Sequence, residues 1–120
     1  MTISEPQYKL RNILKNIFPN FHFEEEYYIG SENLRLDFYC PKLSLAFEYQ
    51  GPQHDEYNPF FFKSEKEFIE QKKRDRRKER WCKLNDVTLI KVKESELDEK
   101  ILREKIARAW EKGAKNANLS

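Results

Sequence analysis

Two acidic residues and one amide lie near the ends of two neighbouring runs that have the pattern of β-strands. Asp37 belongs to the run 34–39 and Glu48 to the run 43–50, with a short bend between them. Because side chains alternate along a strand, Gln50 points to the same side as Glu48. Carboxylate oxygens bind hard divalent cations such as Mg²⁺. This spacing therefore predicts a metal site suited to the hydrolysis of a phosphodiester bond.

The same alternation separates these acids from the most apolar side of the two runs. The apolar residues that alternate with them are Leu36, Phe38, Leu45 and Phe47. Asp37 and Glu48 therefore avoid the apolar face and can converge on a neighbouring one. The alternative is that both are solvated strand residues, with Glu48 paired to Arg35.

A histidine follows the second run within reach of its end. His54 comes four residues after Gln50. An imidazole changes charge near neutral pH and can act there as a general acid or base. The alternative is a histidine with a purely structural role.

A strongly basic stretch forms part of a long helix predicted over 65–84. Seven of the nine residues in 72–80 are Lys or Arg. Phe68, Asp75 and Cys82 are seven residues apart, which is close to two helical turns, so they share one stripe. Since this stripe begins and ends with apolar residues, we expect Asp75 to lie on or near the inward face.

An inward aspartate is costly without a partner. The partner of Asp75 is either Arg74, in a structural interpretation, or His54 and the metal site. In the second case the flanking cations lie beside the site and contact phosphates; they are Lys72, Lys73, Arg74, Arg76 and Arg77. The alternative is a solvated helix face with local ion pairs of about 0.3–0.5 kcal/mol each. The aromatic loop 57–62 either packs under this helix or stacks against bases.

The remaining pattern predicts an α/β domain with a mixed central sheet of about four strands flanked by helices. The first three strands are expected to form an antiparallel meander, and the long helix provides the crossover that a parallel fourth strand needs. We expect residues 1–112 to form the domain and 113–120 a flexible tail or linker, because Gly113 ends the last helix. The expected helices are 4–18, 65–84 and one from 95–98 to 112; the strands are 23–29, 34–39, 43–50 and 87–93.

Composition limits the classes of protein to consider. A chain of 120 residues forms one domain with one modest core, and an aromatic share of 14% argues against disorder. The net charge is only +2, so bulk charge does not indicate a nucleic-acid binder. Cys40 and Cys82 form no CxxC pair and predict reduced thiols in a cytoplasmic, nucleoid-associated protein. No apolar run has the roughly 20 residues of a membrane span, and no secretory signal is predicted.

The ordered set of acids and the histidine resembles a known superfamily. The set is Glu5, Asp37, Glu48-x-Gln50-Gly51, His54 and Asp75. It is similar to the restriction-endonuclease-like PD-(D/E)XK superfamily, and most similar to its very-short-patch repair and phage-type homing endonucleases. The resemblance runs from Ser4 to about Val92. One departure is that Gln50 stands where the motif of the superfamily has lysine.

This resemblance implies a restriction-endonuclease-like fold and metal-dependent cleavage of DNA. Asp37 would be the main ligand of Mg²⁺, for which Mn²⁺ can substitute, and either Glu48 or the carbonyl of Tyr49 would be the second. His54 would take a proton from the attacking water or stabilise charge on the phosphorus, and Asp75 would orient His54. Glu5 of the first helix would help to hold water or metal, and Gln50 would orient water or a phosphate oxygen.

Two other functions stay open at this stage. One is a catalytically weak nuclease-like module that binds nucleic acid. The other is a small structural or toxin–antitoxin-type interaction domain whose charges lie only on its surface. As a nuclease the chain would act on DNA, as the catalytic domain of a homing or mismatch-repair enzyme. A single active site cuts one strand, so a double-strand break would need a homodimer or two sequential nicks.

Overall fold

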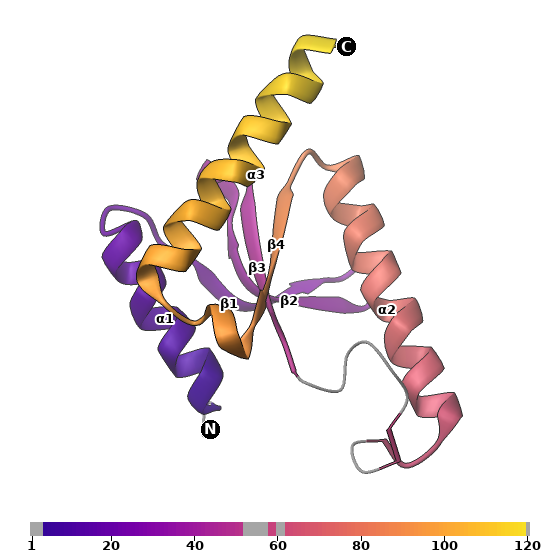
Figure 1. Cartoon of the computed structure of the whole chain (residues 1–120). Helices are drawn as coiled ribbons and strands as arrows, with labels where there is room; N and C mark the ends of the chain where they lie inside the picture. The colour runs from indigo at the N-terminus through magenta and orange to yellow at the C-terminus, as the bar shows by residue number, and fades with distance from the viewer. Residues whose placement is uncertain (1–3, 52–57, 60–61, 120) are drawn as a thin grey trace.

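The computed structural model describes residues 4–51, 58–59 and 62–119, with the backbone alone over 113–119. Within them the chain forms three α-helices around one four-stranded sheet (Figure 1). In chain order the elements are α1 (Glu5–Ile17), β1 (Glu24–Ile29), β2 (Leu34–Cys40), β3 (Leu45–Gln50), α2 (Glu65–Leu84), β4 (Thr88–Lys93) and α3 (Glu99–Leu119).

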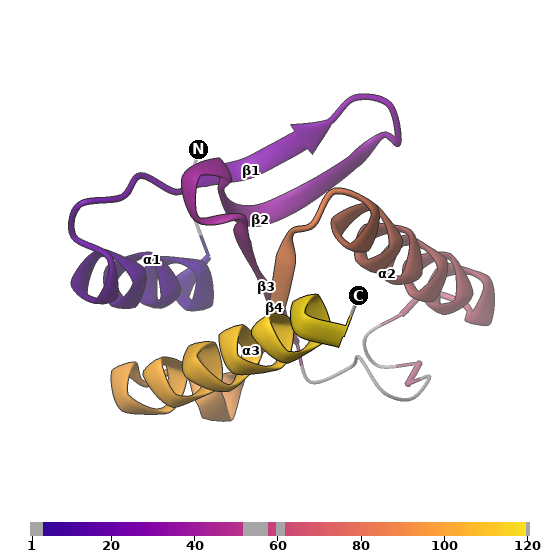
Figure 2. The same cartoon turned by 90° about the horizontal axis from the view of Figure 1, so that it is seen from above.

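The sheet follows the order of the sequence, β1-β2-β3-β4. The first three strands pair antiparallel, and β4 pairs parallel with β3 after the crossover through α2. The predicted α/β class, the antiparallel meander and the mixed sheet are therefore confirmed. Figure 2 shows the β1–β2 hairpin turning away from the β3–β4 pair when the molecule is seen from above.

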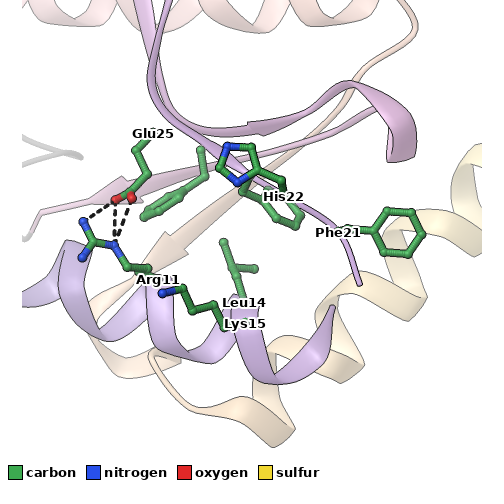
Figure 3. A pocket seen from close by; sticks show the side chains of 8 residues that line it. Arg11, Leu14, Lys15, Phe21, His22 and Glu25 are labelled. Atoms are coloured by element: carbon green, nitrogen blue, oxygen red, sulfur yellow. Dashed lines mark hydrogen bonds and ion pairs between the residues drawn. The ribbon is translucent and has the colours of Figure 1, made fainter. Parts of the chain in front are cut away.

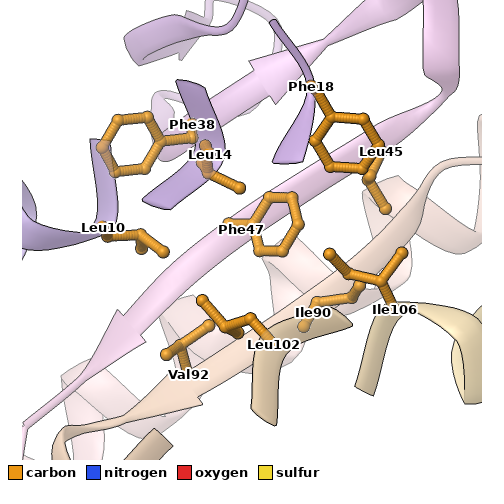
Figure 4. Packing of buried hydrophobic residues seen from close by; sticks show 10 residues of the cluster. All are labelled: Leu10, Leu14, Phe18, Phe38, Leu45, Phe47, Ile90, Val92, Leu102 and Ile106. Carbon is orange, nitrogen blue, oxygen red and sulfur yellow. The ribbon is translucent and has the colours of Figure 1, made fainter. Parts of the chain in front are cut away.

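The helices cover the sheet from two sides. Helices α1 and α3 lie against one face, and α2 lies against the other (Figures 1 and 2). The larger buried cluster lies under α1 and α3 (Figure 4) and consists of Leu10, Leu14, Phe18, Phe38, Leu45, Phe47, Ile90, Val92, Leu102 and Ile106. The smaller cluster lies on the α2 side and consists of Ile29, Leu34, Leu36, Ala46, Cys82 and Val87. Burial of apolar surface in these clusters holds the strands that carry the acids.

Side-chain caps set the beginning of both α1 and α2. The hydroxyl of Ser4 accepts from the backbone N–H of Gln7 at 3.3 Å. The hydroxyl of Ser64 accepts from the backbone N–H of Glu67 at 3.2 Å. Each cap satisfies one of the donors that a helix leaves free at its first turn. The predicted starts of both helices are confirmed.

Two predicted boundaries were wrong. The backbone of α3 continues through Gly113 to Leu119. Glycine costs a helix only about 1 kcal/mol relative to alanine, and the alanines and lysine that follow Gly113 favour helix. Strand β3 begins at Leu45, because residues 41–43 form a 3₁₀ turn and Ser44 has a positive φ of 50°.

The helices within the described residues all lack the length or the apolarity that crossing a lipid bilayer demands.

Candidate active site

Strands β2 and β3 separate at the two acids. Their antiparallel ladder joins Phe38–Cys40 to Leu45–Phe47 and stops there. Beyond that point β3 pairs only with β4, as far as Gln50 opposite Lys93. We call the point of separation, between Asp37 and Glu48, the fork. Figure 1 shows β2 and β3 running in different directions beyond it.

At the fork, backbone N–H groups of β2 and β3 donate to side-chain carboxylates instead of to carbonyls of the paired strand. The N–H of Asp37 donates to Oε2 of Glu48 at 3.0 Å. The N–H of Tyr49 donates to Oδ2 of Asp37 at 2.8 Å. Each acid is therefore held by the main chain of the opposite strand. This reciprocal arrangement fixes both side chains at the point where the ladder ends.

The alternation of side chains along β2 is interrupted at Asp37. Leu36 and Phe38 would share a face in a regular strand, but they belong to the clusters on opposite sides of the sheet. On the neighbouring strand β1, Glu26 would lie opposite Asp37, but the two residues are not paired in the β1–β2 ladder. The backbone of Glu26 has a positive φ of 49°. Such strain typically costs about 1–3 kcal/mol and often marks functional sites.

Lys78 of α2 completes the charges at the fork. Its Nζ lies 2.7 Å from Oε1 of Glu48, and the two side chains are only 21% and 11% exposed. The interpretation of Glu48 as a solvated partner of Arg35 is therefore wrong, because the Arg35 guanidinium lies over the ring of Tyr28. The sheet buries Glu48, and the amphipathic geometry of α2 brings a lysine to it.

Burial raises the pKa of the Glu48 carboxyl to about 8, and the neighbouring Asp37 carboxyl adds to the shift. The Lys78 ammonium acts in the opposite direction. Two carboxyls that share one poorly solvated site resist ionising together. The Glu48 carboxyl therefore holds its proton more readily than an exposed glutamate, and a cation that binds here would compete with that proton.

A pocket of about 110 Å³ opens at the fork. Its lining residues come from three strands and α2: Asp37, Glu48, Tyr49, Gln50, Gln71, Asp75, Lys78, Leu89 and Lys91. The structure thus brings four of the predicted catalytic residues, Asp37, Glu48, Gln50 and Asp75, together with Tyr49. Oxygen donors of this kind suit Mg²⁺, which needs only one or two protein carboxylates and keeps several waters.

The pocket is not a closed metal cage in the described residues, where no three His, Cys, Asp or Glu side chains cluster as metal ligands would. Both oxygens of Glu48 and one oxygen of Asp37 already have partners within the protein. A cation entering here would therefore have to share Glu48 with Lys78. The donor set fits a hard, partly hydrated cation and does not fit a structural zinc.

Glu5, one of the predicted catalytic residues, does not line this pocket as the structure describes it. Glu5 is exposed at the start of α1, where it forms an i,i+4 ion pair with Lys9 at 3.6 Å. A carboxylate in the first turn of a helix is stabilised by the helix dipole, which is a structural reason for an acid at this position. His54 falls within 52–57, outside the described residues.

The predicted phosphate-contacting cations follow α2 beside the pocket. Arg74 and Arg76 are exposed. Arg77 donates to both the backbone and the carboxylate of Glu32, in the turn between β1 and β2. The remaining two cations have neighbours on α2 itself: Lys72 lies over the ring of Phe68, and Lys73 pairs with Glu70 at 3.9 Å. Some of these charges therefore serve the fold, and the exposed arginines face solvent.

The sequence reasoning missed four residues of the pocket, namely the apolar Leu89 and the polar Gln71, Lys78 and Lys91. A signal for Gln71 and Lys78 was present, because Gln71, Asp75 and Lys78 are spaced i, i+4 and i+7. That spacing places them on one face of a helix. This polar face lies beside the stripe of Phe68, Asp75 and Cys82 on the same helix.

A second, larger pocket lies between α1 and β1 (Figure 3). It measures about 420 Å³ and is lined by Arg11, Leu14, Lys15, Phe21, His22, Phe23, Glu25 and Phe38. The Arg11 guanidinium holds Glu25 through hydrogen bonds of 2.9–3.0 Å. Since Glu25 is its only lining carboxylate and is already paired, this pocket lacks the acid pair seen at the fork.

Comparisons with known proteins give two viral relatives in sequence. No family model matches the chain. The chain is 48% identical over 63 residues to uncharacterized protein 307L of Invertebrate iridescent virus 6, a match over 52% of this chain and 32% of that protein. It is 39% identical over 64 residues to uncharacterized protein 033L of Invertebrate iridescent virus 3, covering 53% of this chain and 33% of that one. The match spans about a third of the length of these curated relatives.

A solved structure shares the fold along nearly the whole chain. It is the catalytic domain of the homing endonuclease I-Bth0305I, with a TM-score of 0.59 and 19% sequence identity. The superposition covers 92% of this chain and 98% of that domain. At this level of identity the likeness establishes the fold, which agrees with the predicted α/β architecture.

Proposed function

We propose that this chain is a divalent-metal-dependent endonuclease that hydrolyses phosphodiester bonds in DNA. The fork supports this proposal most directly. There two carboxylates from adjacent strands lie against each other in a pocket with a lysine, on a fold shared with a homing endonuclease catalytic domain. Fold alone does not define activity, so the acid pair carries the argument.

The proposed reaction is the attack of a water oxygen on the phosphorus, with cleavage of one P–O bond. Asp37, with Glu48 or the Tyr49 carbonyl, would hold the cation. When bound, Mg²⁺ or Mn²⁺ polarises the phosphate and lowers the pKa of the water. Gln50 lines the pocket and can orient that water or a phosphate oxygen.

Proton transfer in this proposal belongs to His54, which takes the proton of the attacking water. The leaving oxygen receives a proton from solvent as its bond to phosphorus breaks. Asp75 lines the pocket from α2 and would orient His54. Glu5 is not among the described residues that line this pocket, and its part in holding water or metal stays a prediction of the resemblance.

A second candidate is a nuclease-like module that binds DNA and cleaves it weakly or not at all. One observation favours it. The oxygens of Glu48 are both engaged within the protein, so the site is partly closed without a metal. In that case the basic side of α2 would still bind DNA through phosphate contacts.

Cleavage of supercoiled plasmid tests the proposal and separates the two candidates. We expect nicked circles in Mg²⁺ or Mn²⁺ and intact plasmid in EDTA, with nicked DNA accumulating before linear DNA because each chain has one site. Equal cleavage in EDTA would contradict a metal-dependent mechanism. Metal-independent DNA binding in a gel shift, without nicking at any divalent-ion concentration, would support the second candidate.

Removing two exposed cations of α2 tests the predicted path of the DNA. The double substitution Arg74→Ala with Arg76→Ala should weaken binding similarly for all DNA sequences. It should also reduce the slope of log K against log salt by about two, since each phosphate contact contributes about 0.9. Fluorescence anisotropy of a labelled duplex over a series of KCl concentrations measures both.

The matched control is Lys100→Ala with Arg108→Ala, two exposed cations of α3 on the other side of the sheet. This pair removes the same net charge from the chain. If both double variants lower the slope equally, binding follows overall charge and the assignment of α2 is wrong.

A further inference from the structure

The pocket at the fork contains two cations besides its acids, and they differ in what they face. Lys91 of β4 pairs with Glu79 of α2 and is 33% exposed at its side chain. Lys78 points to the acid pair, 2.7 Å from Glu48, and is 21% exposed. Its neighbours on α2 are far more open, with Lys73 at 62% and Arg77 at 49%. Lys78 is therefore the cation of α2 that is turned inward to the site.

The chemistry proposed for this site requires a positive charge near the phosphate. Negative charge builds up on the phosphate oxygens in the transition state, and lysine, arginine or a metal ion commonly stabilises it. Strand β3 supplies none, because Gln50 is neutral. The helix opposite supplies the ammonium of Lys78, which reaches the same pocket from the other side.

We propose that Lys78 contacts a non-bridging oxygen of the scissile phosphate. The positive charge at the phosphate would then come from α2, whereas β3 has the neutral Gln50. This rests on the proposed function and adds a substrate-contacting residue to it. In the metal-free protein Lys78 is held by Glu48. A divalent cation held by the acids would give Glu48 a second positive partner, which would free the ammonium of Lys78 to face the phosphate.

The physical basis is the shape of the lysine side chain. An ammonium has three donors, and the Oε1 atom of Glu48 takes one of them. Its flexible four-carbon stem allows the head group to turn between Glu48 and a nearby phosphate. In this role the ammonium donates hydrogen bonds and takes no part in proton transfer.

The proposal predicts that the contribution of Lys78 to DNA binding depends on a divalent cation. The test compares the wild type with Lys78→Met by anisotropy of a labelled duplex, in Ca²⁺ and in EDTA, over a KCl series. In Ca²⁺ we expect Lys78→Met to bind about 3–10-fold more weakly, with a log–log salt slope smaller by about one. In EDTA the two proteins should bind equally, because Lys78 is then occupied by Glu48.

Lys83→Met is the matched control, an exposed lysine on the same helix. It should leave the difference between Ca²⁺ and EDTA unchanged. If Lys78→Met does not fold, as judged by circular dichroism, Lys78→Gln replaces it, since its amide can still donate to Glu48. The same binding result is expected for Lys78→Gln.

Cleavage gives a second readout. In Mg²⁺ the single-turnover cleavage rate of Lys78→Met or Lys78→Gln should fall at least about 100-fold.

The outcomes separate this proposal from the nuclease itself. Equal loss of binding in Ca²⁺ and EDTA, or no loss in Ca²⁺, would overturn the role of Lys78. So would a cleavage rate within threefold of the wild type. If the wild type does not cleave but the Ca²⁺-dependent loss is seen, hydrolysis is wrong and the phosphate contact stands. If the wild type does not bind DNA in either condition, both proposals fail.

Discussion

Asp37→Asn is expected to lower Mg²⁺-dependent DNA cleavage at least about a thousandfold while the protein stays folded. The substitution removes the charge that would hold the cation, and a bound metal supplies several kcal/mol of transition-state stabilisation. A loss of about 4 kcal/mol corresponds to a factor of about a thousand. Folding should survive because an asparagine oxygen can still accept from the N–H of Tyr49. Plasmid nicking under single-turnover conditions measures the change.

Asp86→Asn is the control for this prediction. Asp86 lies in the turn between α2 and β4 with a φ of 55°, a conformation that asparagine adopts readily. The variant should cleave like the wild type. A rate for Asp37→Asn within tenfold of the wild type, with the control unchanged, would mean that Asp37 is not the main metal ligand.

Much of the fold follows from local patterns in the chain. The caps at Ser4 and Ser64 and the alternation along the hairpin predict elements that the structure contains. The spacing of Phe68 and Cys82 also places Asp75 on the inward side of α2, where it lines the pocket. Each of these inferences depends on a period within one element, and such periods are visible in a single sequence.

The features that escaped prediction depend on contacts between elements. Strand alternation suggests that Asp37 and Glu48 converge, but it gives no sign that their carboxylates replace backbone partners where the ladder stops. The positive φ of Glu26 arises where one hairpin must pack on both sides of the sheet. The pairing of Lys78 with Glu48 depends on how α2 rotates against β3, which is a property of tertiary packing.

The catalytic role of Glu5 stays a prediction. The resemblance implies that role, and in the structure Glu5 is exposed in the first turn of α1 beside Lys9. A residue whose own geometry points outward needs a contact in the structure before a family role is assigned to it.

Glu48→Gln is expected to remove a pH dependence of stability that the metal-free wild type should show. The pKa of Glu48 is raised from 4.5 to about 8 in the folded chain. Between these values the folded protein binds more protons than the unfolded one, so the free energy of unfolding decreases as the pH rises. One pKa unit corresponds to about 1.4 kcal/mol. Because Lys78 and Asp37 share this charge, we expect a loss of about 2 kcal/mol between pH 5 and pH 8.

Urea denaturation in EDTA across this pH range measures the effect. Glu48→Gln should be about as stable as the wild type near pH 5 and more stable at pH 8, because the amide carries no charge to bury. Glu32→Gln, which removes a carboxylate far more open than that of Glu48 (43% against 11% exposed), should keep the wild-type dependence. Mg²⁺ should raise the stability of the wild type most at pH 8, where it no longer competes with a proton for Glu48. A wild type whose stability increases from pH 5 to pH 8 would contradict the raised pKa of Glu48 and the burial that causes it.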